Sequence, residues 1–202
     1  MKIFISFLAR QIYKTDYLFF KEKLLSLHKE AKNQILCNNP EVLTKLLISG
    51  EDHRFKYHLG FDIIAIIRAC RNNIFYNKKE GASTIEQQLV RVLTNDFKLT
   101  FSRKVKEIFL STTTSDLVPK NIIPLLYLHV AYYGDGLTGI KKVFENHSIA
   151  SNSTISLEFA AEIVAQIKYP RAKCFTEKRN RQIETRKKHL LHLHKKNITS
   201  IF

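Results

Sequence analysis

Apolar residues recur in steps of three and four along most of this chain, and that spacing restricts its fold more than any other feature of the sequence. Between positions 13 and 36 apolar residues recur at Tyr17, Phe20, Leu24, Leu27 and Ala31, with Lys and Glu in several of the gaps. A period of three to four residues places apolar side chains on one face of a helix. No alternating series of the kind that predicts a β-sheet is present. The sequence therefore predicts a mostly α-helical chain.

Local signals mark where further helices begin. Pro40 suits the first turn of a second helix, and Ser83 with Glu86 has the Ser-x-x-Glu spacing of a capping box. The run 61–70 is almost continuously apolar, and its length favours a buried helix over a strand. Helices are also expected from Ser102, from Pro119 and over 157–167, and the glycines at 134, 136 and 139 mark a loop.

Positive charge is concentrated towards the end of the sequence. The chain of 202 residues has 33 Lys and Arg against 18 Asp and Glu, a net charge of +15. Residues 168–202 hold eleven Lys and Arg against two Glu, so they carry +9 and the preceding 167 residues carry +6. Such a field favours anionic partners: lipid head groups, a diphosphate substrate or nucleic acid. A solvated tail without a partner is the alternative, and His189, His192 and His194 fit such a tail better than a metal site.

Composition excludes several classes of protein. A hydrophobic fraction of 45% excludes a disordered chain, and three scattered Cys without a C-x-x-C pair exclude a disulfide framework or a zinc knuckle. The apolar run from Ile3 to Ala9 is far shorter than the roughly 20 residues of a membrane-spanning helix, and it lacks the cleavage site of a secretory signal. The sequence thus predicts neither a transmembrane helix nor a signal peptide.

Three segments carry residues suited to catalysis or anion binding. The first reads E-D-H-R-F-K-Y-H-L-G-F-D. If it is helical, one face holds Glu51, Phe55, His58 and Asp62, and the alternative is a solvated acidic pair. The second, G-A-S-T-I-E-Q-Q from Gly81, opens a helix whose free amides suit a phosphate, although a helix cap alone explains it. The third, R-K-V-K-E from Arg103, also fits a salt-bridged surface helix.

Taken together, in this order, the segments resemble the peptidoglycan glycosyltransferase family (glycosyltransferase family 51). Its first three motifs are E-D-x-x-F-x-x-H-x-G, G-x-S-T-I-x-Q-Q and R-K-x-x-E. The residues that match them are Glu51, Asp52, Phe55, His58 and Gly60; Gly81, Ser83, Thr84, Ile85, Gln87 and Gln88; and Arg103, Lys104 and Glu107. A fourth motif, K-x-x-I-L-x-x-Y-L-N, is matched in part by Lys120, Ile123, Tyr127 and Leu128.

The resemblance implies a lysozyme-like fold with a larger lobe and a smaller membrane-facing lobe. Within it we expect an amphipathic helical segment over 1–40, a transglycosylase domain over 41–170 and a basic helical tail over 171–202. It places the chain peripherally at the outer, periplasmic face of the cytoplasmic membrane. Its partners would be lipid II, the growing glycan strand, an anionic membrane surface and other cell-wall synthesis proteins, but not nucleic acid.

The resemblance also implies an inverting polymerisation of lipid II into β-1,4 glycan strands with release of undecaprenyl diphosphate. Glu51 would be the general base, and Glu107 a second required carboxylate that orients cations or holds a divalent ion such as Mg²⁺ or Mn²⁺. The residues expected to bind substrate are Asp52, Phe55, His58, Ser83, Thr84, Gln87, Gln88, Arg91, Lys98, Arg103, Lys104 and Lys120.

The chain departs from the family pattern at several positions. Leu99 stands where the family has an Arg, His129 replaces the Asn that closes the fourth motif, and Pro124 replaces its Leu. These departures favour an alternative, a non-catalytic member that binds lipid II or a cell-wall partner. A lysozyme-like hydrolase is a further alternative, which would shorten finished glycan strands.

Overall fold

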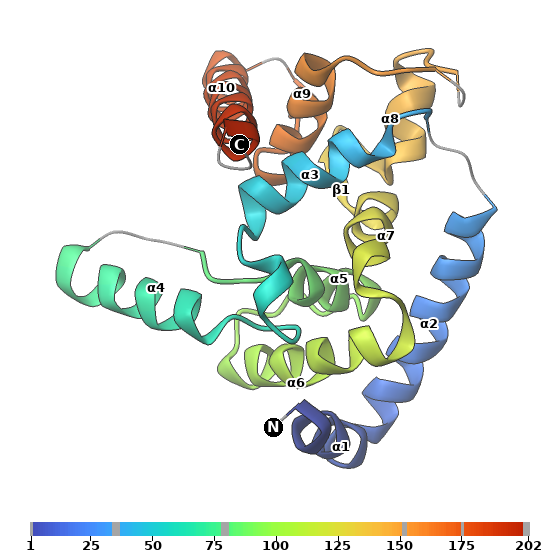
Figure 1. The fold of residues 1–202 in the computed structure, drawn as a ribbon, viewed down its shortest axis with the longest axis vertical. Helices are drawn as coiled ribbons and strands as arrows, with labels where there is room; N and C mark the ends of the chain where they lie inside the picture. The colour runs from blue at the N-terminus through green and yellow to red at the C-terminus, as the bar shows by residue number, and fades with distance from the viewer. Residues whose placement is uncertain (1, 34–36, 78–80, 151–152, 175, 200–202) are drawn as a thin grey trace. The chain divides into compact units, whose positions relative to one another are not determined.

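The computed structural model describes all residues except 1, 34–36, 78–80, 151–152, 175 and 200–202 (Figure 1). The described elements, in chain order, are α1 (Lys2–Ile12), α2 (Lys14–Lys32), α3 (Pro40–Glu51), η1 (Phe55–Tyr57), α4 (Ile63–Tyr76), α5 (Ile85–Leu93), α6 (Phe101–Leu117), η2 (Lys120–Ile122), α7 (Ile123–Val130), β1 (Tyr132–Gly134), β2 (Leu137–Thr138), α8 (Ile140–Asn146), α9 (Leu157–Lys168) and α10 (Glu177–Thr199). They confirm the prediction of a mostly α-helical fold. Among the described residues, no helix combines the length and the apolar character that spanning a bilayer requires.

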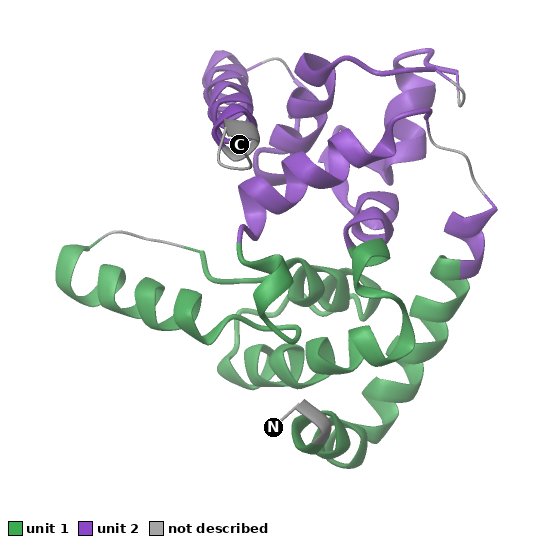
Figure 2. Ribbon diagram, viewed as in Figure 1, with its two compact units in different colours: residues 1–28, 54–123 green, residues 29–53, 124–202 purple. Residues whose placement is uncertain are grey.

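The chain forms two compact units, each built from two separate stretches (Figure 2). Unit 1 contains residues 1–28 and 54–123, and unit 2 contains residues 29–53 and 124–202. This division differs from the linear one expected over 1–40, 41–170 and 171–202, because helices that are distant in sequence pack together within each unit.

In unit 1, α6 packs against both α1 and α5. Ile85, Leu89 and Leu110 are fully buried in this unit. The side chain of Ser6 in α1 donates a hydrogen bond of 2.5 Å to Asp116 near the end of α6. The first helix of the chain is therefore part of the packed unit.

Helix α4 projects away from the rest of unit 1 (Figure 1). Its residues were expected to form a buried helix; the helix is confirmed, but the expected burial is wrong. Ile64, Ile67 and Ile74 are 56%, 63% and 73% exposed, and Ala65 is the buried residue of this helix. An apolar run has the same sequence pattern whether it faces a protein core or another apolar environment, so periodicity could not separate the two.

In unit 2, α9 packs against α3, α10 and strand β1, and α10 also packs against α3 (Figure 1). Ile183 and Leu190 of α10 are 4% and 0% exposed. The basic helix expected as a solvated or membrane-facing tail is thus a packed element of this unit. The glycine-rich loop expected over 134–139 also contains structure, a short antiparallel hairpin of β1 and β2.

The structure corrects the expected helix starts by one or two residues. Helix α5 is capped by Thr84, whose hydroxyl accepts a hydrogen bond of 3.2 Å from the Gln87 amide, while Gln87 Oε1 accepts one of 3.2 Å from the Thr84 amide. The capping box therefore runs from Thr84 to Gln87, rather than from Ser83 to Glu86. Helix α6 is likewise capped by Thr100, and Ser102 lies inside it.

The segment 51–62 is not one helix, so the single helical face expected for it is wrong. Helix α3 ends at Glu51, a 3-10 turn covers Phe55–Tyr57, and Asp62 caps α4. Gly60 lies in the turn with φ of 108°, and a Cβ there would stand 2.3 Å from the carbonyl oxygen of Ser111. The motif glycine is required because both its backbone conformation and its close approach to α6 exclude a side chain.

Candidate active site

Three cationic side chains converge on the buried carboxylate of Glu107 in unit 1. Arg91 in α5 donates from Nε to Oε2 at 3.0 Å and from Nη2 to Oε1 at 3.1 Å. Arg103 Nη1 donates to Oε2, and Lys104 Nζ donates to Oε1 at 2.7 Å. Glu107 itself is 2% exposed. One carboxylate balances one of three positive charges, so this cluster keeps an excess of positive charge.

Lys104 connects the cluster to the start of α5. Its ammonium group donates to Ser83 Oγ at 3.0 Å and to Gln87 Oε1 at 3.2 Å. Burial lowers the pKa of Lys104, the hydrogen bond and charge of Glu107 offset part of that effect, and the charges of Arg91 and Arg103 lower the pKa further. The structure therefore brings together six of the residues predicted for substrate binding and catalysis: Ser83, Gln87, Arg91, Arg103, Lys104 and Glu107.

The surroundings of Glu107 fit an organiser of cations better than a metal ligand. Each of its oxygens accepts from two donors, and all of these donors belong to positively charged side chains. A divalent cation at this carboxylate would face three positive charges at close range. These contacts do not fit Mg²⁺ or Mn²⁺ at Glu107, and a divalent cofactor elsewhere stays a prediction.

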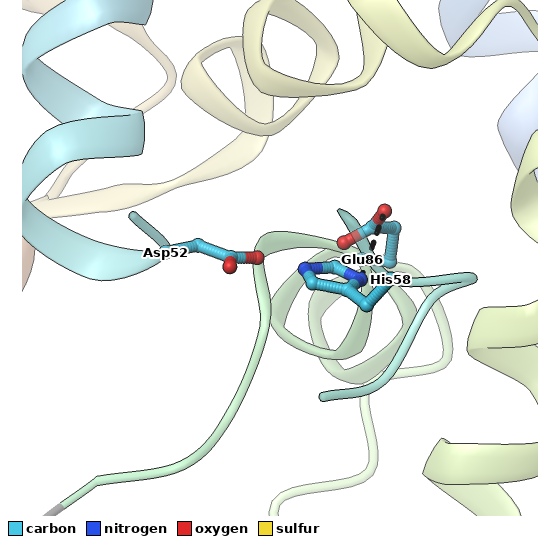
Figure 3. Close-up of side chains that lie close together, drawn as sticks. All are labelled: Asp52, His58 and Glu86. Atoms are coloured by element: carbon cyan, nitrogen blue, oxygen red, sulfur yellow. Dashed lines mark ion pairs between the residues drawn. The ribbon is translucent and has the colours of Figure 1, made fainter. Parts of the chain in front are cut away.

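A second cluster in unit 1 surrounds His58. Figure 3 shows His58 beside Glu86. Nδ1 of His58 lies 4.0 Å from Oε1 of Glu86. Lys120 Nζ lies 3.6 Å from Glu86 Oε1, donates to the carbonyl of His58, and stands 4.9 Å from the centre of the Phe55 ring. The Gly60 amide donates to His58 Nδ1 at 3.3 Å. Predicted substrate-binding residues Phe55, His58 and Lys120 thus lie together.

Sequence reasoning missed Glu86. It occupies the variable position of the second motif and is fully buried. Its position had been read as the acidic end of a capping box, a role that the neighbouring Gln87 fills. The cap of α5 is complete without Glu86, and Glu86 lies on the inward face of that helix. A glutamate in such a position is the signal that could have identified Glu86 as a site residue.

Glu51 and Asp52 belong to unit 2, at the C-terminal end of α3. Arg186 of α10 donates from Nη2 to Glu51 Oε1 at 2.8 Å and to the carbonyl of Gly50 at 2.5 Å. The side chains of Glu51 and Arg186 are 15% and 10% exposed. Asp52 caps the helix through its amide, which donates to the carbonyl of Ile48 at 2.9 Å. Sequence reasoning assigned Arg186 no role.

The remaining predicted residues have other positions. Thr84 is buried in unit 1, where its hydroxyl donates to the Gly60 carbonyl at 2.6 Å. Gln88 lies in α5 and is partly exposed, and the Lys98 amide donates to Asp96 Oδ1 in an exposed loop. No described contact joins Lys98 to the cations around Glu107. The roles assigned to all of these residues stay predictions.

Comparison with known proteins identifies the family of the chain. Residues 21–195 match the family described as Transglycosylase, which is most of the chain. The chain belongs to this family. The glycosyltransferase class and the resemblance inferred from the three motifs are thereby confirmed.

Two groups of relatives support the assignment. Penicillin-binding protein 1A of Rickettsia prowazekii (strain Madrid E) is 36% identical over 139 residues, which are 66% of this chain and 17% of the relative. The monofunctional glycosyltransferase of Staphylococcus aureus (strain Newman) is 37% identical over 120 residues, which are 58% of this chain and 45% of the relative. The matches thus span less than half the length of either relative.

Proposed function

We propose that this transglycosylase-family chain is a peptidoglycan glycosyltransferase that polymerises lipid II into β-1,4 glycan strands and releases undecaprenyl diphosphate. The observation that carries the proposal is the excess of positive charge at Glu107. Arg91, Arg103 and Lys104 are held by one carboxylate in a region matched to the family.

A diphosphate leaving group explains why three cations gather at one place. Negative charge grows on the leaving oxygens as the glycosidic bond to phosphate breaks, and donors fixed in advance stabilise that charge without reorganisation. Arginine binds phosphate oxygens in a bidentate manner, and lysine contributes a compact charge. In this scheme Glu107 orients the three cations and does not exchange a proton.

Glu51 is the proposed general base. Its carboxylate takes the proton from the 4-hydroxyl of the acceptor sugar as that oxygen forms a bond to the anomeric carbon of the donor. The bond between the anomeric carbon and the diphosphate breaks, and the diphosphate leaves with the bonding electrons. Attack opposite the leaving group inverts an α-diphosphate to a β-1,4 linkage. General base catalysis contributes roughly 10²- to 10⁴-fold to such a step.

The exposed apolar residues of α4 support a peripheral membrane location. Apolar patches of this kind mark surfaces that meet a partner or a membrane, and the lipid tail of the proposed substrate requires contact with a bilayer. Binding to anionic phospholipid vesicles tests this part of the proposal. We expect Ile67→Glu to weaken vesicle binding more than Asn73→Glu. Both substitutions add one negative charge to α4, but only Ile67→Glu removes an apolar side chain. Equal loss in both variants would contradict insertion of this face.

Polymerisation of labelled lipid II tests the function directly. We expect wild-type protein to produce glycan polymer, and Glu51→Gln to lose about 10²-fold or more of the rate while keeping the helical circular dichroism spectrum. Glu41→Gln is the matched control, because Glu41 is an exposed residue at the opposite end of the same helix. A Glu51→Gln variant that polymerises at the wild-type rate would refute the role of Glu51.

One observation favours the alternative of a non-catalytic member that binds lipid II. Leu99, which replaces a family arginine, is 98% exposed, so this position supplies no charge to a substrate phosphate. The same assay separates the two functions. Wild-type protein that binds lipid II and forms no polymer would favour the non-catalytic alternative, and shortening of finished strands would indicate a hydrolase.

A further inference from the structure

We propose that Arg186 is a positioning residue for the general base: its guanidinium holds the Glu51 carboxylate in place at the end of α3. This inference rests on the proposed function, because it concerns the residue assigned there as the base. Arg186 comes from the basic helix α10, which the motifs of the family resemblance did not include.

The end of a helix is an unfavourable place for a carboxylate. Glu51 is the last residue of α3, where the free carbonyl groups and the negative end of the helix dipole disfavour negative charge. Arg186 Nη2 lies 2.8 Å from Glu51 Oε1 and 2.5 Å from the Gly50 carbonyl oxygen. One nitrogen therefore compensates both the carboxylate and one of the helix-end carbonyls.

The absence of a side chain at Gly50 leaves space for the Arg186 guanidinium to reach the end of α3. A Cβ at Gly50 would stand 3.0 Å from Arg186 Nη2 and 2.4 Å from Leu190 Cδ2. Ile183, Arg186 and Leu190 follow one another on α10 at steps of three and four, so Arg186 lies on the buried face between two core residues. Glycine at position 50 is what allows α10 to approach this closely.

Stability does not explain a charged residue at this position. Arg186 is 10% exposed, and its Nε has no hydrogen-bond partner among the residues that the structure describes. A buried ion pair contributes little net stability, because desolvation of both charges offsets their attraction. An apolar residue would fill the same position at lower cost. The need to hold a general base in the correct orientation explains the charged residue instead.

The cavity beside Arg186 makes the proposal testable by chemical rescue. It has a volume of about 570 Å³, and Arg186 lines it together with Lys168, Arg181 and His189. Arg186→Ala would leave the carboxylate without its guanidinium and open a space next to this cavity. Free guanidinium ion at millimolar concentration, well below denaturing levels, can occupy that space.

The experiment compares Arg186→Ala, Arg186→Lys and Arg181→Ala in the lipid II polymerisation assay. We expect Arg186→Ala to lower kcat about tenfold to a hundredfold with little change in KM, as misplacement of a catalytic group does. Arg186→Lys should keep an intermediate rate, and guanidinium should raise the rate of Arg186→Ala but not that of Glu51→Gln. Arg181→Ala is the matched control, since Arg181 lines the same cavity and pairs with Glu177.

A second measurement does not depend on turnover. The ¹³C signal of the Glu51 carboxyl at pH 7, assigned with Glu51→Gln, should move in Arg186→Ala relative to wild type, because the hydrogen bond from Arg186 to Oε1 is lost. Lys168 and His189 line the same cavity, so the comparison is repeated with His189→Asn in both backgrounds. The shift should persist there if it arises from Arg186.

The outcomes separate this inference from the proposed function. Wild-type protein that forms no polymer refutes the function, while the carboxyl signal still decides whether Arg186 holds the Glu51 carboxylate. An active wild type with unchanged kcat in Arg186→Ala overturns the inference. So does a loss of kcat that neither lysine nor guanidinium restores and that leaves the Glu51 carboxyl signal unmoved, since that result indicates a structural role.

Discussion

Replacement of Glu107 by Gln removes the one negative charge that holds three cations together. Loss of one partner from a buried ion pair costs about 3–5 kcal/mol, because the other charge stays behind uncompensated. The side chains of Arg91 and Lys104 are 28% and 30% exposed, so water screens part of their charge, whereas that of Arg103 is 12% exposed. We therefore expect a loss near the lower limit, about 3 kcal/mol, and a fall in Tm of about 6–12 °C.

A double-mutant cycle measures whether the three cations repel one another. In wild type, Arg103→Gln should destabilise the protein, because it removes a donor to Glu107. In the Glu107→Gln background the same change should be neutral or stabilising, because it removes one of three uncompensated charges. Urea denaturation of the four proteins should give a coupling energy of about 1–2 kcal/mol.

An exposed pair provides the control for this cycle. Lys141 and Glu145 lie 3.9 Å apart with side chains 65% and 61% exposed, and their coupling should be below about 0.5 kcal/mol. If Arg103→Gln costs the same in both backgrounds, the positive charges do not depend on Glu107. The argument for a pre-organised diphosphate site would then fail.

Three further predictions concern stability. Asp62→Ala should cost about 1–2 kcal/mol at pH 7, because Asp62 caps α4. Burial raises the pKa of Asp62, but the Ala65 and Ile64 amides and Arg54 lower it overall from 3.8. Urea denaturation should therefore show that the difference in free energy of unfolding between wild type and Asp62→Ala narrows as the pH falls below 3.8. Burial lowers the pKa of His129 from 6.5, and the charge of Glu30 opposes that effect, so the contribution of His129 to Tm should weaken as the pH drops below 6.5. Between pH 8 and 5.5, Tm should therefore change less with pH in His129→Asn than in wild type. An equal change of Tm with pH in both proteins would contradict this. Gly50→Ala should lose about 1–3 kcal/mol because its Cβ meets Leu190 at 2.4 Å, whereas Gly81→Ala, with no atom within 4 Å, should be neutral or slightly stabilising in the same denaturation assay.

The sequence predicted the helices well because their apolar spacing and caps are local signals. Pro40 does open α3, and residues 157–167 do form a buried helix, α9. The cap of α5 was misplaced by one residue because Ser83 and Thr84 are both good caps, each followed three residues later by an acid or an amide. Contacts with Lys104 and Gly60 decide between them, and these are tertiary.

The candidate site was predicted only where the family resemblance supplied the residues. Arg103, Lys104 and Glu107 lie within one or two turns of a helix, so their contact follows from local geometry. The pairing of Arg186 with Glu51 joins residues 135 positions apart. The many Lys and Arg of α10 concealed the buried stripe of Ile183 and Leu190, so the helix was interpreted as a tail.

The surroundings of two glutamates give them different chemical capacities, although the motifs treat both as required. Glu107 accepts from three cationic side chains through both of its oxygens, so its contacts suit it to hold charges in place. Glu51 accepts from one guanidinium through Oε1 at the end of a helix, which suits a carboxylate that is held in position to accept a hydroxyl proton. If this difference is functional, Glu107→Gln should impair binding of a diphosphate analogue while Glu51→Gln should leave that binding intact. The opposite pattern in a binding titration would exchange the two roles.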